Sequence, residues 1–382
     1  MRNGFSQQHF SKQPLQSGAG FTLIETLVVG AIVIVVSVAG FLGLAQYRNK
    51  QVLGSGLNEL RAAVEGTKRR SVAQEEGSRW GIRFTNATSG TSSYSVFRGT
   101  SYSTSGLDRT YSFRGALGFG NPSTSSTYDL VFSPLSGALS ENKVVTLVGG
   151  SKGFIGDLIL RAVGSITARQ DYNVVGYWHL DEGTSTSAYD ASGYGNTGML
   201  TTGPTWQSGS SCKAGSCLSF DGADDYVILP SVNPTAAITV TAWIKSNSSS
   251  GYSGAWQLIS KYSAYILGTG STGGKNINFI VYTNNSWRYG TYYTVSDPQN
   301  WHFFAGVYDS ATQLKKLYMD GVQRTSDTVT STINADTGPI HLAHRESVGV
   351  GVDHFGGVID EVRIYDRALS ATEIEALYNN LE

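Results

Sequence analysis

Residues 20–25 read GFTLIE, and an apolar run over residues 26–45 follows directly. A helix over residues 21–45 would be roughly 37 Å long at about 1.5 Å per residue, enough to cross a hydrocarbon core of about 30 Å. A carboxylate inside the bilayer costs about 2.5–3.5 kcal/mol or more, so Glu25 needs a positive partner. Cleavage after Gly20 would create that partner, because the new amino terminus of one copy could neutralise the carboxylate of a neighbouring copy.

This segment resembles the amino-terminal region of type IV pilins and type II secretion pseudopilins. The shared features are a short leader with Arg2 and Lys12, the pair Gly20-Phe21, and Glu25 ahead of an apolar helix. In that family a membrane peptidase cleaves after the glycine and methylates the new terminal residue, and the glutamate guides subunit docking. The resemblance implies that Gly20 is the cleavage residue, Phe21 the mature terminus and Glu25 the assembly carboxylate.

The alternative is a secretory signal peptide or a plain anchor. A signal peptide has a shorter apolar core that is followed by a small-x-small cleavage site. Here the small residues Gly18, Ala19 and Gly20 precede the apolar run. This order favours the pilin interpretation, with a prepilin leader at 1–20 and a transmembrane or filament-core helix at 21–45.

The remaining chain is long enough for two folded domains. The sequence has 382 residues, and its net charge of −1 gives no reason to expect a general attraction to nucleic acid. Only 15% of the residues are charged, whereas Gly occurs 46 times and Tyr 21 times, a composition that suits β-structure with many turns. Cys212 and Cys217 are the two cysteines, and in an exported domain their short spacing predicts a disulfide.

Residues 46–170 are predicted to form a pilin-like α+β domain. The helical spacing of Leu53, Leu57, Leu60 and Val64 indicates one apolar face that packs on a small antiparallel sheet. Short apolar strands are expected at 81–84, 94–97, 128–132, 144–148 and 157–160. The order of helix and strands resembles the GspH/FimT-type pseudopilin subgroup.

A second domain is predicted over residues 171–382. Alternating apolar strands separated by turns indicate an all-β sandwich of two sheets. A series of sequence blocks resembles, in order, the laminin-G-like, concanavalin A-like jelly-roll family. The blocks lie at 177–183, 190–196, 218–227, 238–244, 301–309, 317–321 and 355–370. Ser370 and Glu373 form a capping-box pattern, which predicts a short helix at the end of the chain.

The jelly-roll resemblance implies a structural calcium ion. Calcium prefers six to eight oxygen ligands from carboxylates, amides and backbone carbonyls. By their positions in the blocks, Asp190, Asn196 and Asp360 are the expected ligands, because the first and last strands of this architecture pair. The alternative is that these side chains cap turns, as Asp often does beside Gly.

Carbohydrate is the ligand that such a sandwich favours, with a host or matrix protein as the other candidate. Sugar rings stack on flat aromatic side chains, while their hydroxyls meet polar groups. The expected ligand-binding residues are Trp256, Trp287, Tyr289 and Tyr292, and Tyr252 is placed with them in loops. The alternative for each residue is packing in the core or on a sheet surface.

Catalysis is not expected from this sequence. Glycosidases that share the sandwich need two inward acids at a fixed separation, and no predicted strand carries an acid-x-acid pattern. The histidines are scattered along the sequence. A basic cluster between Arg61 and Arg83 could hold DNA through phosphate contacts, as in competence pilins of the FimT type. A solvated helix face is the favoured interpretation, so nucleic acid is not an expected partner.

These features predict a modular type IV pilin that assembles through its N-terminal helix and displays the jelly roll for adhesion. Its expected partners are other pilin subunits, a prepilin peptidase and a carbohydrate or surface-protein ligand. We expect it in the bacterial inner membrane before assembly and then on an extracellular filament. A minor or tip position is expected, because a large second domain would crowd a densely packed shaft. The alternatives are a type II secretion pseudopilin with a structural head and a DNA-binding competence pilin.

Overall fold

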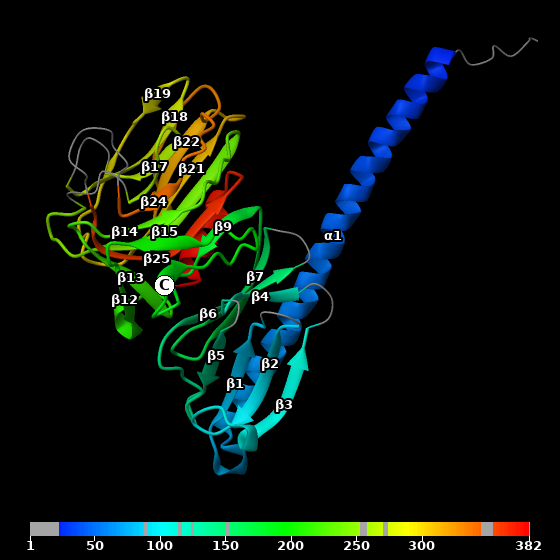
Figure 1. Cartoon of the computed structure of the whole chain (residues 1–382), viewed down its shortest axis with the longest axis vertical. Coiled ribbons are helices and arrows are strands. Elements are labelled where there is room, and N and C mark those ends of the chain that lie inside the picture. Colours follow the sequence, from blue (N-terminus) through cyan, green and yellow to red (C-terminus); the bar gives the residue numbers. More distant parts are fainter. Residues whose placement is uncertain are drawn as a thin grey trace, which may run out of the picture. The chain divides into compact units, whose positions relative to one another are not determined.

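The structure is a computed structural model of the whole chain (Figure 1). It describes residues 23–87, 91–113, 117–123, 126–149, 153–252, 258–269, 274–344 and 354–381. Several side chains in the first helix, including that of Glu25 and those of residues 33–43, are not described. The predicted processing residues Gly20 and Phe21, the side chain of Glu25, and the predicted ligand residue Trp256 therefore lie outside the described part.

The chain divides into two compact units, residues 1–48 and 49–382. The domain boundary expected at residue 170 falls inside the second unit. Helix α1 (Leu23–Val72) belongs to both units. In the first unit its described apolar side chains are exposed, among them Ile24, Leu27 and Ile32. Among the described residues, none of the helices combines the length and the apolar composition that crossing a membrane requires.

In the second unit, α1 packs through one apolar face. Leu53, Leu57, Leu60 and Val64 are buried, as the helical spacing predicts. They share a core with residues of two antiparallel sheets in the part of the chain that the structure describes, whereas one small sheet was expected. Local sequence patterns do not show this division, because the strand at 117–121 belongs to the second sheet and yet precedes the strand at 127–131, which belongs to the first.

The first sheet has the order β3-β2-β1-β5 and the second the order β4-β6-β7-β8. Their strands are β1 (Trp80–Thr85), β2 (Ser93–Arg98), β3 (Leu107–Ser112), β4 (Leu117–Asn121), β5 (Thr127–Val131), β6 (Lys143–Gly149), β7 (Phe154–Leu160) and β8 (Ile166–Tyr172). Short 3-10 turns lie at η1 (Glu75–Gly77), η2 (Thr104–Gly106) and η3 (Gly209–Ser211).

Two further sheets form the sandwich that the sequence predicts (Figure 1). One has the order β10-β11-β14-β24-β16-β17-β18-β19, with β20 beside β18. The other has the order β12-β13-β25-β15-β21-β22-β23, with β9 beside β25. The strands of the first are β10 (Ser187–Ala188), β11 (Gly198–Thr201), β14 (Tyr226–Leu229), β16 (Ile259–Lys261), β17 (Tyr265–Gly268), β18 (Asn276–Thr283), β19 (Ser286–Arg288), β20 (Tyr293–Thr294) and β24 (Ile340–Leu342). The strands of the second are β9 (Val174–Trp178), β12 (Thr205–Ser208), β13 (Ser216–Asp221), β15 (Ala237–Ser246), β21 (His302–Asp309), β22 (Leu314–Met319), β23 (Val322–Thr328) and β25 (Gly356–Tyr365).

Strand β15 is buried on both faces, which places it between two cores. Ile238, Val240 and Ile244 point into the core between the two sandwich sheets. Trp243, on the opposite face, belongs to a second core, which also contains Val144 and other residues of β6 and β7. Because side chains alternate along a strand, one continuous apolar run can serve both cores. The sandwich and the β4-β6-β7-β8 sheet are thus packed together within the second unit. We call the interface between them the junction, and the core that contains Trp243 and Val144 the junction core.

A buried ion network crosses the same junction. Arg363 Nη2 on β25 lies 3.1 Å from Asp157 Oδ2 on β7 and 2.9 Å from Glu361 Oε2. His179 Nδ1 lies 2.8 Å from Glu361 Oε1, and Arg169 Nη2 lies 2.8 Å from Asp157 Oδ2. Burial would raise the pKa of Asp157, but the guanidinium groups of Arg363 and Arg169 outweigh it and lower the pKa. The charges therefore compensate one another away from water.

A bulge in β25 aims one of these acids at the junction. Thr241 pairs with Arg363 and Trp243 with Asp360, so β25 carries one residue more than β15 between the two pairs. Glu361 has φ 54°, in the left-handed region. A bulge of this kind redirects a side chain within a sheet. Both Asp360 and Glu361 are consequently buried.

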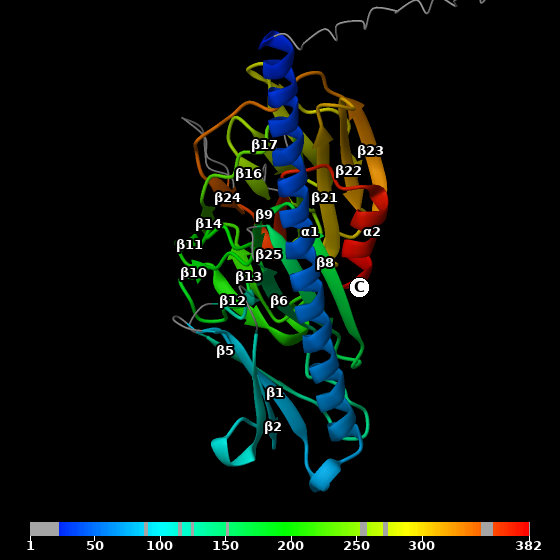
Figure 2. The ribbon, with the colours of Figure 1, turned by 90° about the vertical axis from the view of Figure 1, so that its right-hand side faces the viewer.

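Helix α2 (Ala371–Asn379) follows the last strand and lies beside β23 (Figure 2). The predicted capping box is present, because Ser370 accepts from the backbone of Glu373 and the Glu373 side chain accepts from the backbone of Ser370. Ile374 and Leu377 are buried in the junction core, as their helical spacing predicts.

Candidate functional site

An aromatic surface lies at the β18–β19 edge of the sandwich. The rings of Tyr262 and Tyr282 contact Trp287, and Tyr289 and Tyr292 follow in the segment after β19. We call these five residues the aromatic edge. Trp287 pairs across the strands with Tyr282, with ring centroids 4.8 Å apart. The ring centroid of Tyr262 lies 6.2 Å from that of Trp287. Tyr289 and Tyr292 are 42% and 49% exposed, so their rings are available to a ligand.

The buried Lys315 and the partly buried Asp327 hold the turn that carries the exposed tyrosines. Lys315 Nζ donates to the carbonyls of Phe279, Arg288 and Tyr289, at 2.7, 3.1 and 2.5 Å. Asp327 accepts from the Thr291 backbone at 3.0 Å. These hydrogen bonds hold the backbone of the turn in one conformation before a ligand arrives. Less conformational entropy is then lost when the ligand binds.

The Lys315 ammonium is an unusual group for a sandwich core. Burial lowers its pKa to about 8, and the Asp327 carboxylate opposes the shift. The turn also needs glycine at 290, where φ is +65° and an added Cβ would lie 2.3 Å from Asp327 Oδ2. No local sequence pattern indicates this contact, because Lys315 and Tyr289 are 26 residues apart.

The aromatic predictions have mixed outcomes. Trp287 lies half-buried on the sheet surface, while Tyr289 and Tyr292 are exposed. The prediction that Tyr252 lies in an exposed loop is wrong, because its side chain is fully buried against Phe304 and Phe355. Trp287, Tyr289 and Tyr292 thus remain accessible to a ligand, whereas Tyr252 does not.

The expected calcium ligands have other contacts. Asp190 accepts from the backbone amides of Tyr177, Ser192 and Asn196, at 3.0, 2.9 and 2.8 Å. The Asn196 side chain donates to the Val175 carbonyl at 2.8 Å. These contacts are those of a side chain that caps a turn, the alternative raised by the sequence.

Asp360 is occupied at a different place. Its Oδ2 accepts from the amides of Lys213 and Ala214, at 2.9 and 3.1 Å. Burial raises its pKa well above the usual range, and Glu361 adds to that effect. The first and last strands do pair, as expected, since β9 lies beside β25. Asp190, Asn196 and Asp360 thus hold separate backbone groups, and these hydrogen bonds do not join them into one ligand set.

The amides that Asp360 holds belong to the disulfide loop. Cys212 and Cys217 are bonded, with their Cα atoms 5.4 Å apart, so the predicted disulfide is confirmed. Cys217 lies on β13 and is buried. The disulfide and Asp360 together fix this short loop against β25.

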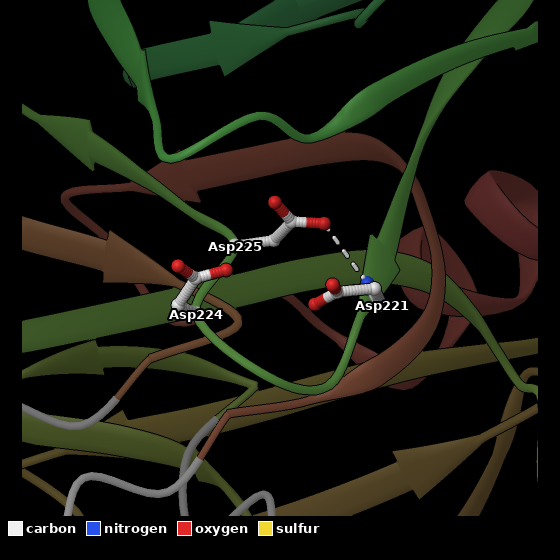
Figure 3. Close-up of side chains that lie close together, drawn as sticks. All are labelled: Asp221, Asp224 and Asp225. Carbon is white, nitrogen blue, oxygen red and sulfur yellow. Dashed lines mark hydrogen bonds between the residues drawn. The ribbon is translucent and has the colours of Figure 1, made fainter.

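Three carboxylates converge at the β13–β14 turn (Figure 3). One oxygen from each of Asp221, Asp224 and Asp225 lies within 4.8 Å of the others. Asp225 Oδ2 accepts from the Asp221 amide at 3.0 Å, and Asp221 Oδ1 accepts from the Ala223 amide at 2.7 Å. The hydrogen bond from Ala223 lowers the pKa of Asp221, whereas burial raises the pKa of Asp225. These oxygens could serve a hard cation.

Asp181 and Glu182, which are not among the expected site residues, line a cavity of about 380 Å³. Asp181 accepts from the Ser216 amide at 2.7 Å and from the Asn121 side chain at 2.9 Å. Burial raises the pKa of Asp181 to about 6 and that of Glu182 to about 7. The cavity joins residues 120–128 to residues 179–189, so local sequence patterns carry no sign of it.

The histidines are not all scattered in space. His341, His344 and His354 gather around Tyr226, with neighbouring histidine ring centroids 5.1 and 4.9 Å apart. Burial lowers the pKa of His344 to about 4, and the two other histidines add to the effect. The His344 ring is therefore neutral at neutral pH.

Acids accompany much of the basic cluster. Arg83 forms two hydrogen bonds of 2.6 Å with Asp129. Arg70 pairs with Glu75 and Asp108, and Arg61 with Glu65. Phosphate binding requires cations that are available to solvent. These pairs are consistent with the solvated helix face that the sequence favours.

Residues 221–375 match the family described as the concanavalin A-like lectin/glucanases superfamily, Laminin_G_3. This part of the chain is a concanavalin A-like jelly-roll domain, as the sequence blocks predict. No match was found among curated proteins.

Solved structures of low similarity accompany this match. One is domain 4 of AbnA, a GH43 extracellular arabinanase from Geobacillus stearothermophilus, in complex with arabinotriose, with 18% identity, a TM-score of 0.43, and coverage of 54% of this chain and 98% of that chain. The binding domain of Paraclostridial Mosquitocidal Protein 1 has 14% identity and a TM-score of 0.43, with 54% of this chain and 52% of that chain covered. A botulinum neurotoxin type C structure, described as dependent on two ganglioside molecules for cell entry, has 16% identity and a TM-score of 0.43, with 55% and 51% covered. This chain therefore spans about half the length of the last two.

Proposed function

We propose that this protein is an adhesive filament subunit whose jelly roll binds carbohydrate through the aromatic edge. The observation that carries the binding proposal is the exposure of Tyr289 and Tyr292 in the segment after Trp287, where Lys315 holds the Tyr289 carbonyl. Flat rings fixed at an edge suit the apolar faces of sugars. The match to a family that includes lectins supports the same ligand class.

The experiment is a glycan-array screen of the full chain in mild detergent. Any glycan that binds is then titrated against Trp287→Ala and Tyr289→Ala, which should each weaken binding roughly ten-fold, equivalent to about 1.4 kcal/mol. The matched control is Tyr194→Ala, which removes a tyrosine that is 39% exposed and lies outside the aromatic edge. Equal losses in all three folded variants would refute the proposed surface.

The filament half of the proposal rests on the N-terminal helix. Exposed apolar side chains at Ile24, Leu27 and Ile32 would be costly in water and are suited to burial against lipid or other copies. Together with the GFTLIE segment, they support prepilin cleavage after Gly20, methylation of Phe21 and assembly through Glu25. The residence proposed is the bacterial inner membrane before assembly and the filament surface afterwards.

Mass spectrometry of the protein from its native cells tests this part. We expect a mature terminus at Phe21 that carries a methyl group, and we expect Glu25→Ala to abolish filament incorporation. Retention of Met1 would exclude the proposal. Immunogold labelling then separates a tip or minor position from even labelling along the fibre.

We also propose that the protein binds its ligand without chemical change to it. A glycosidase needs two carboxylates on either side of the bond that it cleaves, whereas the residues of the aromatic edge are tyrosines and a tryptophan. Incubation with each bound glycan, followed by chromatography, should return the glycan intact.

A further inference from the structure

The cavity that contains Asp181 and Glu182 is separate from the aromatic edge. Asn121, Ser126 and Tyr128 line it on one side, and Asp181, Glu182 and Tyr189 on the other. Its volume of about 380 Å³ greatly exceeds the roughly 10–15 Å³ that a cavity needs in order to hold one water molecule. A molecule of the size of a single sugar or an amino acid side chain therefore fits.

Glu182 leaves one acceptor of this cavity unmatched. Its Oε1 accepts from the Tyr189 amide at 2.7 Å, whereas its Oε2 is buried and receives no hydrogen bond from the described residues. A buried acceptor without a donor costs about 1–3 kcal/mol, and more when it is charged. A ligand that brings donors to this oxygen would remove the cost.

Burial is the largest effect on the pKa of Asp181, and the nearby Lys143 and His179 oppose it from a distance, while their direct contacts are with other groups. Lys143 Nζ lies 2.5 Å from Glu141 Oε1 and 4.8 Å from the centroid of the Tyr128 ring. His179 lies between Glu361 and Thr146, at 2.8 and 2.7 Å. The acidic side of the cavity thus has a need for positive charge that the surrounding side chains only partly meet.

The wall behind Asp181 is built for close approach. At Gly215, φ is +56° and an added Cβ would lie 1.8 Å from Asp181 Oδ1. The backbone can therefore reach this carboxylate only because residue 215 has no side chain. Asn121 holds the second oxygen, so Asp181 has a fixed orientation.

A compact metal ion does not fit these groups. Within the described ranges, three His, Cys, Asp or Glu ligand atoms come within 4.8 Å of one another only at Asp221, Asp224 and Asp225. Asp181, Glu182 and His179 do not form such a group. The cavity is instead an extended, polar space with acids at one end and hydroxyl groups at Ser123, Ser126 and Ser185.

We propose that this cavity binds a small polar ligand that carries a protonated amine, with the ammonium group against Glu182 and Asp181. An ammonium supplies three hydrogen-bond donors together with the compensating charge. Hydroxyl groups of the ligand would meet the serines and Asn121. The amine could belong to an amino sugar or to the lysine side chain of a partner, and the two sources share the same recognition.

Calorimetric titration of the full chain in mild detergent tests the proposal with four probes. They are glucosamine, N-acetylglucosamine, glucose and Nα-acetyl-lysine amide. We expect at least one amine to bind, and the neutral sugars to bind at least ten-fold more weakly. Preference for glucosamine identifies the amino-sugar source, and preference for the lysine derivative identifies the side-chain source. Absence of amine binding, or equal binding of glucose and glucosamine, overturns the proposal.

Variants locate the binding site. Glu182→Gln keeps the shape but removes the charge, and should weaken amine binding at least ten-fold. Glu375→Gln is the matched control, since Glu375 is exposed on α2, away from the cavity lining, and this change should leave amine binding unaltered.

Thr127→Phe fills the cavity from an exposed position and serves as a second variant should Glu182→Gln fail to fold. Trp287→Ala should leave amine binding intact, so the failure of one site is distinguishable from the failure of the other. Unchanged affinity in Thr127→Phe would place the amine elsewhere and overturn the assignment.

Discussion

At the residue scale, Lys315 connects a buried charge to an exposed surface. Its ammonium donates to backbone carbonyls at 288 and 289, the residues from which the aromatic edge turns toward solvent. The position of Tyr289 therefore depends on a side chain that no ligand touches. Lys315 is in this sense a positioning residue for the proposed glycan surface.

We predict that Lys315→Met loosens this turn. The carbonyls of Phe279, Arg288 and Tyr289 lose a shared donor, so the free energy of unfolding should fall by about 1–3 kcal/mol. Urea unfolding measures that loss, and glycan titration should show weaker binding by the same variant. A variant as stable as the wild type would contradict the role of Lys315.

The difference in unfolding free energy between the wild type and Lys315→Met should depend on pH, with a sign that follows from the pKa of Lys315. Burial lowers the pKa of Lys315 to about 8 in the fold, while an unfolded lysine has a pKa of about 10.4. Between these values the unfolded chain binds more protons, so this group makes stability rise with pH. The wild type minus Lys315→Met difference should therefore grow between about pH 8 and about pH 10.

For the two cavity acids, Asp181 and Glu182, we predict the opposite trend: their contribution to stability falls as the pH rises. Burial raises the pKa of Asp181 to about 6 and that of Glu182 to about 7, against unfolded values near 4. The folded state then holds more protons, so their contribution to stability is full below about pH 4 and is lost as pH rises toward about 7. Glu182→Gln should flatten this part of the unfolding profile, measured by urea titration at each pH. An identical slope in the variant would contradict the shifted pKa.

At the element scale, the capping box decides where α2 begins. Ser370 and Glu373 exchange hydrogen bonds between side chain and backbone, and both partners are close in sequence. This is why the sequence pattern alone predicted the helix correctly. The buried faces of Ile374 and Leu377 then attach α2 to the junction core.

We predict that Ser370→Ala lowers the free energy of unfolding by about 1 kcal/mol, because the first turn of α2 loses an acceptor for a backbone amide. Guanidinium unfolding measures the change. Ser370→Thr keeps the hydroxyl and is the matched control, for which most of the stability should remain. Equal losses from both variants would point to packing in place of capping.

Calcium stays a prediction, and the turn between β13 and β14 is the element where it can be examined. If calcium binds at Asp221, Asp224 and Asp225, a chelator should lower the melting temperature of the full chain, because a ligand of the native state stabilises it by mass action. Asp224→Asn should reduce that effect, since Asp224 is an exposed member of the group. An unchanged midpoint, with no metal in the purified protein, would refute calcium binding.

At the scale of the whole molecule, residues 49–382 behave as one compact unit. The junction core and the ion network both cross the boundary that the sequence placed at residue 170. The β4-β6-β7-β8 sheet and the sandwich are therefore joined by a shared apolar core and by buried ion pairs within this unit.

We predict that Arg363→Met lowers the free energy of unfolding by about 3–5 kcal/mol, because Asp157 and Glu361 would remain buried without their partner. Thermal or urea unfolding measures the loss. Arg98→Met is the matched control, since Arg98 pairs with Glu76 at the surface and such pairs contribute about 1 kcal/mol or less. Losses of similar size would show that the buried network has no special role.

Much of the architecture followed from patterns that are local in the chain. The apolar faces of α1 and α2, the capping box, the disulfide and the succession of sandwich strands all depend on residues a few positions apart. Periods of 3.6 and 2 record which face of an element is buried, so they can be read before the structure is known. The GFTLIE segment likewise predicts an assembly function from adjacent residues, although that part of the chain lies largely outside the described residues.

Tertiary structure alone decided what the long-range contacts produce. Asp157 meets Arg363 across 206 residues, and Asn121 meets Asp181 across 60. Asp360 turned to the disulfide loop and Tyr252 entered the core, because a side chain takes the partners that the packed fold offers. Burial then shifted the pKa values of Asp181, Glu182 and Lys315, and burial is a property of the assembled fold that no short stretch of sequence contains.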